Sequence, residues 1–392
     1  MSDAPKLTLL YWLLTEGRTA PDIPSLLEAF GEQLQRYTST ERIWYGTRLL
    51  HPQTAAYIWL WTAGEPVIER ELGYARFAEL RDTVDSPARQ LERGAPSVRF
   101  RSDSADSDSG AGIPDVAALW ERGYTDLFGL SVRFRSAWVG GVTWSTRAPG
   151  GFSDAEIALL EAVAPALEAV SEPLCKDLVT SVLLKTYLGR DAGNRVFHGE
   201  VQRGDGESLE AVVWFSDVRG FTQLSAELDS AALLDLLNDH FELVVRALGR
   251  NGGEVLKFMG DGLLGVFPVV DGDRAAACRS ARAAALSFRE ELAGLTRRRS
   301  EAGLRPAEVG VALHFGDVAY GNIGAPDRLD FTVIGPAVNL AARIESLCGK
   351  LGHPILASQT FVALEGGAWV PCGEHPVKGV AERVAVARPV EI

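Results

Sequence analysis

The chain has 392 residues, more than one hydrophobic core usually organises, so the length predicts two domains of about 150 to 200 residues each. Its hydrophobic fraction of 46% and charged fraction of 23% are close to those of soluble globular proteins, which excludes a largely disordered chain. The formal net charge of −13 argues against a general nucleic-acid-binding protein, because binding to a phosphate backbone needs an excess of Lys and Arg on one face.

The start of the chain carries no membrane or secretion signal. Its longest apolar stretch, residues 7–14, is too short to span a bilayer and lacks the basic flank and cleavage site of a secretory signal. We therefore expect a cytoplasmic protein without a membrane partner. The cysteines are scattered without a CxxC pair or zinc-like spacing, so we expect small buried side chains and neither a disulfide framework nor a structural metal. They are Cys175, Cys278, Cys348 and Cys372.

Residues 1–172 are predicted to form a first domain with both helices and strands. The Ser- and Asp-rich run 102–110 has no apolar residue able to pack, which is typical of a solvated loop. The expected elements are a helix over 25–37, strands over 56–61, 127–135 and 138–145, and a short turn at Ser136 and Ala137 between the last two strands.

A further helix is predicted to begin after Ser153, because Glu156 follows at the spacing of a capping box. Its apolar residues recur at three- and four-residue steps and would form one stripe, able to pack on a sheet or a second subunit. The stripe consists of Ile157, Leu160, Val163, Leu167 and Val170. This pattern resembles the end of a GAF-like sensory domain covering roughly residues 20–172. No cysteine, haem or nucleotide ligand set identifies an effector, so a dimerising scaffold that binds nothing stays open as the alternative.

Residues 173–207 are predicted to be a helical linker. A helix ends at Gly189, and residues 190–207 are rich in Gly and charged side chains. The segment could transmit a signal as a coiled-coil-like dimer stalk, or it could act only as a tether.

An apolar run that starts at Ala211 ends abruptly at Asp217, shortly before Gly220 and a helical segment. A carboxylate at the end of a buried strand, beside a turn whose amides open a helix, is well placed to hold a metal and a phosphate. The same Asp could equally cap the helix, so its position alone does not assign a metal site.

A second carboxylate lies in a predicted β-hairpin. After a helix over 230–248, strand-like runs at 254–258 and 263–267 are joined by a turn at Asp261 and Gly262. Asp-Gly is common turn chemistry, so Asp261 by itself would be only a turn residue. If its strand neighbours the one that ends at Asp217, the carboxylates can meet, and paired carboxylates that bind two hard cations are a standard means of assisting phosphoryl transfer.

A third segment, residues 329–343, is typical of a strand, a turn and the start of a helix. Asn339 and Arg343 are four positions apart and would share one helix face. There an amide can fix a ribose, and a guanidinium can neutralise charge on a phosphate. The alternative, a structural Asn and a solvated Arg, stays open on the spacing alone.

Taken in order, these segments resemble the class III adenylyl and guanylyl cyclases. The matching segments are 215–222, 257–262, 309–318, 332–343 and 377–379, and the resemblance covers essentially residues 208–388. It implies a ferredoxin-like α/β domain, placed here over residues 208–392, that works as an antiparallel dimer with each active site shared between two chains. Because this chain carries both halves of the residue set, the resemblance implies a homodimer with two complete sites.

The resemblance also implies a role for each site residue. Each site would bind two magnesium or manganese ions, one to activate the ribose 3′-hydroxyl and one to bind the triphosphate. Their ligands would be Asp217, Asp261 and the Val218 carbonyl of one chain. The second chain would supply Lys257 and Thr332 to the base, Asn339 to the ribose, Arg343 to the charge of the transition state, and Lys378 to the terminal phosphates. Phe221 and Thr222, within the first matching segment, are further substrate-binding candidates.

Hydrogen bonding at the base predicts ATP as the substrate. Adenine presents an acceptor at N1 and a donor at its amino group, which suit the ammonium of Lys257 and the hydroxyl oxygen of Thr332, whereas guanine reverses both. Family members often have Asp at the second position, and Thr marks a subgroup often stimulated by bicarbonate, so a response to bicarbonate or another small-molecule regulator is an open expectation. An Arg that some mammalian-type members use for phosphate is absent, because Asp317 occupies its segment. The loop at Asp327 and Arg328 is one candidate to compensate.

We therefore predict an adenylate cyclase that converts ATP to 3′,5′-cyclic AMP and diphosphate and is regulated by its N-terminal domain. One alternative is a guanylate cyclase, which Lys257 opposes because a Glu there would favour GTP. Another is a catalytically silent cyclase-homology domain, which would require a missing site residue, and none is missing. A diguanylate cyclase is discounted, because Gly252-Gly253-Glu254 resembles its signature but is followed by Val255 and Leu256.

Overall fold

A computed structural model describes residues 4–83, 86–104, 110, 112–135 and 139–390, and the chain divides into two compact units, Met1–Leu183 and Leu184–Ile392. The expected turn at Ser136 and Ala137, and most of the expected loop at 102–110, lie outside the described residues.

The first unit is built on a six-stranded antiparallel sheet with the order β3-β2-β1-β6-β5-β4. The strands are β1 (Arg42–Thr47), β2 (Thr54–Thr62), β3 (Glu65–Gly73), β4 (Ser97–Arg101), β5 (Asp126–Arg133) and β6 (Val139–Thr146). The helices are α1 (Ala4–Thr15), the short 3-10 helix η1 (Gly17–Thr19), α2 (Ile23–Leu34), α3 (Tyr74–Thr83), α4 (Pro87–Glu92), α5 (Pro114–Glu121) and α6 (Asp154–Leu188). The unit is therefore α+β, as the sequence predicted.

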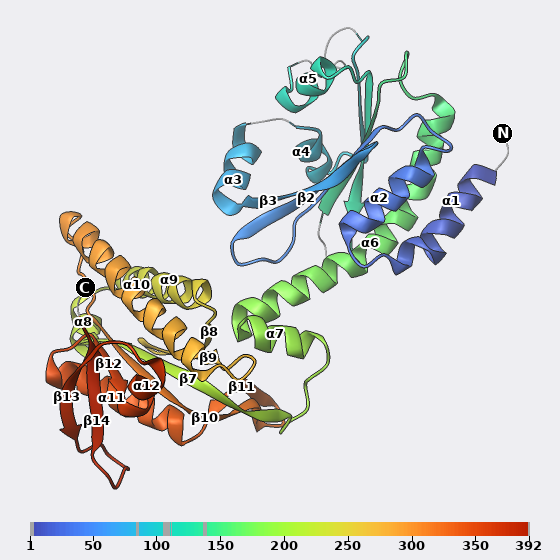
Figure 1. The fold of residues 1–392 in the computed structure, drawn as a ribbon. Helices are drawn as coiled ribbons and strands as arrows, with labels where there is room; N and C mark the ends of the chain where they lie inside the picture. The colour runs from blue at the N-terminus through green and yellow to red at the C-terminus, as the bar shows by residue number, and fades with distance from the viewer. Residues whose placement is uncertain (1–3, 84–85, 105–109, 111, 136–138, 391–392) are drawn as a thin grey trace. The chain divides into compact units, whose positions relative to one another are not determined.

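The two faces of this sheet differ in what covers them (Figure 1). Because side chains alternate along a strand, Ile43 and Tyr45 of β1 point to one face and Trp44 to the other. The first face packs against α1, α2 and α6 and holds the main core of the unit. A smaller apolar cluster, which includes Leu91 and Val116, lies under α4 and α5 on the other face.

Helix α6 begins as its sequence predicts. The Ser153 N–H donates to the Glu156 carboxylate at 2.8 Å, and the Glu156 N–H donates to the Ser153 hydroxyl at 3.4 Å, which is the expected capping box. The predicted apolar stripe is largely buried, with Leu160 and Val163 fully enclosed. Gly189, with φ +97°, follows the last helical residue.

The second unit contains an eight-stranded sheet in which β13-β14-β12-β10-β7-β9-β8 form the path and β11 pairs with β10. Its strands are β7 (Gly206–Val218), β8 (Glu254–Met259), β9 (Gly262–Pro268), β10 (Val309–Ala325), β11 (Arg328–Ile334), β12 (Ile355–Ser358), β13 (Trp369–His375) and β14 (Val384–Pro389). Its helices are α7 (Arg190–Phe197), α8 (Phe221–Glu227), α9 (Ser230–Arg250), α10 (Arg274–Glu301), α11 (Pro336–Leu351) and α12 (Gln359–Glu365). The central order β10-β7-β9-β8, with α9 and α10 as crossovers, is the expected ferredoxin-like arrangement.

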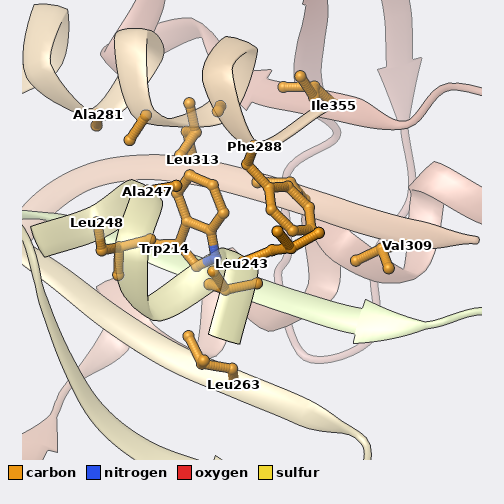
Figure 2. Packing of buried hydrophobic residues seen from close by; sticks show 14 of the residues in the cluster. Trp214, Leu243, Ala247, Leu248, Leu263, Ala281, Phe288, Val309, Leu313 and Ile355 are labelled. Atoms are coloured by element: carbon orange, nitrogen blue, oxygen red, sulfur yellow. The ribbon is translucent and has the colours of Figure 1, made fainter. Parts of the chain in front are cut away.

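The core of the second unit lies between this sheet and helices α9 and α10. The fully buried Trp214 of β7 meets Phe288 of α10 edge to face, with ring centroids 6.0 Å apart, and lies near Leu243 and Ala247 of α9 (Figure 2). Alternate residues of β7, such as Val213, pack on the opposite face with residues of α11. Strand β7 is thus buried on both faces, which fixes the position of its end.

All four cysteines are free; Cys175, Cys278 and Cys348 are buried, as expected, and Cys372 is half-buried. Within the described ranges, no helix combines the length and the apolar character needed to cross a membrane.

Candidate active site

The site is built around Asp217, which is the penultimate residue of β7. Strand β7 pairs with β9, and the Ser216–Leu263 pair places the start of β9 beside Asp217. The turn that joins β8 to β9 carries Asp261, so the structure brings the two carboxylates together. The close approach depends on Gly262, since a Cβ there would lie 3.1 Å from the Asp217 carboxylate.

The surroundings of Asp217 disfavour its charged form. Partial burial, then the hydrogen bond and negative charge of Asp261, raise the pKa of Asp217 from 3.8 to about 7. Glu345 acts in the same direction, whereas the hydrogen bond from the Val218 N–H opposes it. Asp217 therefore resists carrying its full charge near neutral pH.

Glu345 is a third carboxylate near this pair, and the sequence analysis missed it. It lies on α11, only 9% exposed, and burial raises its pKa, with Arg219 opposing and Asp261 contributing. A Cβ at Gly310 would come within 2.5 Å of its carboxylate, so this Gly of β10 makes room for it. A Glu within a helix usually indicates a solvated face, and only the packing of α11 on the sheet reveals the burial.

The donor set fits hard divalent cations. Asp217, Asp261 and the Val218 carbonyl offer only oxygen ligands, which magnesium and manganese prefer. A cation would also remove the electrostatic conflict that raises the pKa of Asp217. Across the described residues, no group of three or more His, Cys, Asp or Glu side chains is arranged to hold a metal ion, so a site here would rest on two carboxylates.

Lys257 lies on β8, an edge strand, and forms an ion pair with Asp330 of β11. Its Nζ donates to the Asp330 Oδ2 at 2.5 Å, and this bond lowers the pKa of the Asp330 carboxyl. Both side chains are about two-fifths exposed, at 42% and 39%. Thr332 lies two positions after Asp330, hence on the same face of β11, while the intervening Phe331 is buried. The structure therefore brings Lys257 to the face that carries Thr332, through a residue that the sequence analysis did not assign.

Asn339 and Arg343 lie one turn apart on α11, as their spacing predicted. Both are exposed, whereas Ala337 and Ala341 of the same helix are buried. Arg343 and Glu345, two positions apart, point to different sides of α11. The helix thus turns a buried carboxylate toward the Asp217 region and an amide and a guanidinium toward solvent.

The remaining candidates lie elsewhere on the second unit. Lys378 is exposed on the loop between β13 and β14, at the opposite end of the sheet path from β8. Phe221 begins α8 and packs partly against the main core, and Thr222 beside it is exposed. No hydrogen bond or ion pair found among the described residues joins Lys378 or Arg343 to Asp217 and Asp261.

Known proteins resemble the second unit. Residues 206–386 match the family described as the adenylate and guanylate cyclase catalytic domain. An adenylate cyclase of Anabaena cylindrica is 32% identical over 165 residues, covering 41% of this chain and 32% of the relative. Adenylate cyclase 1 of Rhizobium meliloti is 29% identical over 157 residues, covering 39% of this chain and 23% of the relative. The chain thus spans less than a third of the length of either relative.

Among solved structures, the adenylyl cyclase CyaB from P. aeruginosa is 30% identical, with 48% of this chain and 97% of that chain covered and a TM-score of 0.44. The family match, the strand order and the carboxylate pair agree on the class of domain. Residues 206–386 belong to the class III adenylate and guanylate cyclase family. That family includes both adenylate and guanylate cyclases.

Proposed function

We propose that the protein is an adenylate cyclase that converts ATP to 3′,5′-cyclic AMP and diphosphate. The observation that carries this proposal is the Asp217–Asp261 carboxylate pair, held at the end of β7 in a cyclase-family domain. Two relatives named adenylate cyclase, each about 30% identical, support the choice of reaction.

Asp217, Asp261 and the Val218 carbonyl would hold two magnesium or manganese ions. When bound, these ions supply the positive charge that activates the ribose 3′-hydroxyl and binds the triphosphate. The chain itself contributes the fixed geometry: β7 is buried on both faces, and the glycine at 262 lets the hairpin approach.

Lys257 and Thr332 would select adenine. The Lys257 ammonium would donate to N1, and the Thr332 hydroxyl oxygen would accept from the 6-amino group. Asp330 supports this proposal, because it directs the flexible Lys257 side chain to the face of β11 that carries Thr332. Guanine offers N1–H and a carbonyl oxygen at these places and would leave the ammonium facing a donor.

We propose further that the active site is shared between two copies of the chain. Asn339 and Arg343 turn to solvent on α11, and Lys378 lies on a distant loop, so a second copy would present them to the first copy's metal ligands. Asn339 would orient the ribose, Arg343 would stabilise charge in the transition state, and Lys378 would contact the terminal phosphates. Phe221 and Thr222 would border the substrate near the metal ligands.

We also propose that residues 1–172 regulate this activity through the linker at 173–207, with 208–392 as the catalytic domain, in a cytoplasmic protein. Turnover by the full chain would be compared with turnover by a variant that begins near Leu209. A large difference supports regulation, and equal rates would leave the first unit as a scaffold.

The main test is turnover of ATP and GTP by the purified full chain with magnesium or manganese. We expect cyclic AMP from ATP, little product from GTP, and loss of activity in Asp261→Ala. Asp177→Ala, which removes an exposed Asp of α6, is the matched control and should stay active. Activity that survives in Asp261→Ala would refute the metal assignment.

The shared site has its own test. Asp217→Ala and Arg343→Ala chains should each be inactive alone, because each lacks an essential group in both sites. A mixture should regain activity, since a mixed dimer contains one site without either lesion. A mixture that exchanges subunits and stays inactive would exclude the shared site.

A further inference from the structure

The first unit contains a cavity of about 580 Å³ on the sheet face that α3, α4 and α5 cover. Its size falls within the range of about 300 to 1,000 Å³ that is usual for small-molecule sites. Strands β1, β2, β3 and β6 supply its floor, and the three helices supply its walls. The cavity is therefore a defined space inside one unit.

Glycines face each other across two strands of the floor, and larger side chains lie over them. Gly46 of β1 pairs with Gly141 of β6, and Thr47 pairs with Gly140. A Cβ at Gly46 would lie 2.4 Å from the Trp44 ring, and one at Gly141 would lie 2.9 Å from the Leu91 side chain. The absence of side chains at this pair lets the Trp44 ring lie over Gly46 and the Leu91 side chain pack close to Gly141, where both help to line the cavity or its neighbourhood.

Part of the lining is apolar. Trp44 and Ile58 come from the strands, and Phe77 and Leu80 come from α3. Aromatic and branched side chains of this kind form a surface for the apolar body of a small molecule, since burying that body removes its surface from water.

The charged lining residues are mostly cations. The cavity is lined by Arg42, Arg48, Arg70, Arg76, Arg89 and Arg122, against Glu92 and Asp115. Two of these cations form ion pairs, Arg48 with Glu92 at 3.1 Å and Arg76 with Glu79 at 2.7 Å, which leaves Arg42 among the arginines available to a ligand. The protein as a whole carries a net charge of −13, so the charge of this lining is opposite in sign to that of the whole chain.

Arg42, at the start of β1, is one of these cations. Its Nε is buried and has no hydrogen-bond partner within the described part of the chain. Burial lowers the pKa of its guanidinium to about 10, with Arg122 and Arg70 adding to the effect and Tyr124 and Asp115 opposing it. Burying a cation that lacks a full set of hydrogen-bond acceptors costs free energy, unless an anion supplies the missing acceptors.

We propose that this cavity binds a small organic anion, whose acidic group lies against Arg42 and whose apolar body lies between Trp44 and Phe77. The guanidinium fork of Arg suits both carboxylate and phosphate oxygens, so the two head groups share the chemistry recognised here.

Binding to the full chain is measured by calorimetry with three probes of one shape: 2-naphthoate, 2-naphthyl phosphate and the neutral 2-naphthamide. At least one acid should bind at least tenfold more tightly than the amide, and the tighter acid identifies the preferred head group. Equal affinities for acids and amide, or no binding of either acid at millimolar concentration, would overturn the proposal.

Variants locate the binding. Arg42→Met should weaken the acids at least tenfold and leave the amide unchanged, whereas Arg36→Met, at an exposed Arg outside the cavity, should change neither. Leu60→Trp keeps every charge but fills the cavity, so it should abolish binding of all three probes. Circular dichroism verifies that each variant is folded. If Arg42→Met is unfolded, Leu60→Trp decides, because undiminished acid binding there places the anion outside the cavity and refutes the proposal.

Discussion

The ammonium of Lys257 on β8 and the carboxylate of Asp330 on β11 form a hydrogen-bonded ion pair, with 2.5 Å between Nζ and Oδ2. A lysine side chain has many rotamers, so this contact restricts where the ammonium points before a nucleotide arrives. Under the proposed function, Lys257 contacts the adenine base, and Asp330 is then a positioning residue that acts through Lys257.

Asp330→Asn should weaken the binding of ATP without abolishing turnover. The pair is partly exposed, and such pairs contribute about 0.2 to 1 kcal/mol, which corresponds to at most about a fivefold rise in KM. We expect kcat to change less than KM, and the preference for ATP over GTP to fall. Steady-state kinetics with both nucleotides measure these effects. The matched control is Asp177→Asn, at an exposed Asp of α6 that has no proposed role in the site. A loss confined to kcat, with the nucleotide preference intact, would contradict the positioning role.

Gly262→Ala should lower activity more than stability. The added Cβ would lie 3.1 Å from both the Asp217 carboxylate and the Ser216 carbonyl oxygen, so the hairpin tip must move by a few tenths of an ångström. Small displacements of catalytic groups are costly, and we expect at least about a tenfold loss of kcat/KM. Gly260→Ala is the comparison, because at φ +67° it strains the backbone but meets no neighbouring atom. Thermal melting and turnover together distinguish the two, and a Gly262→Ala enzyme of full activity would contradict the close approach.

Asp261→Asn should stabilise the protein when no divalent cation is present. The substitution removes a negative charge from beside Asp217 and keeps the shape of the side chain. Manganese at a hundredfold excess over its Kd should add up to about 2.7 kcal/mol to the free energy of unfolding of the unmodified chain, and its melting temperature should rise accordingly. The melting temperature of the variant should barely change. Asp177→Asn should respond to manganese like the unmodified chain. An equal shift in Asp261→Asn would show that the cation binds elsewhere.

His240→Leu should make the protein more resistant to mild acid. His240 of α9 is fully buried against Phe288, and its two ring nitrogens have no hydrogen-bond partner among the described residues. Burial lowers its pKa from 6.5 to about 4. Between these pH values His240 is therefore protonated in the unfolded chain but mostly neutral in the folded protein. Stability from this residue is complete above pH 6.5 and is lost as the pH falls toward 4, by at most about 3 kcal/mol.

The test is urea unfolding of the full chain at pH 7.5 and pH 5. The variant should lose less stability between the two values than the unmodified chain. His314, whose pKa is also lowered to about 4 by burial, remains in both proteins and retains part of the acid sensitivity. An unchanged difference between the two pH values would show that His240 does not cause it.

The sequence predicted those parts of the fold and the site that depend on local patterns. The capping box at Ser153 and Glu156 and the shared helix face of Asn339 and Arg343 follow from spacing, and both are found. That Asp217 and Asp261 meet depended on β7 and β9 being neighbours, which only the matching order of segments indicated. The roles of these residues stay predictions.

What the sequence did not indicate depends on contacts between distant segments. Asp330 was not predicted as a site residue, although its separation from Thr332 by two positions on one strand could have suggested a shared face. Glu345 has no local signal, since only the packing of α11 buries it. The cavity of the first unit is lined by residues from several strands and from α3, α4 and α5, and nothing in the linear chain indicates that they lie together.

Strand β8 carries Lys257 at the free edge of the sheet, with Phe258 and Met259 exposed beside it at 50% and 37%. Proteins normally cover an edge strand with exposed apolar side chains. A second copy seated there would make the rate per chain depend on the concentration of the enzyme itself. Dilution would then lower the turnover rate per chain, and the concentration of the protein would determine how active each molecule is.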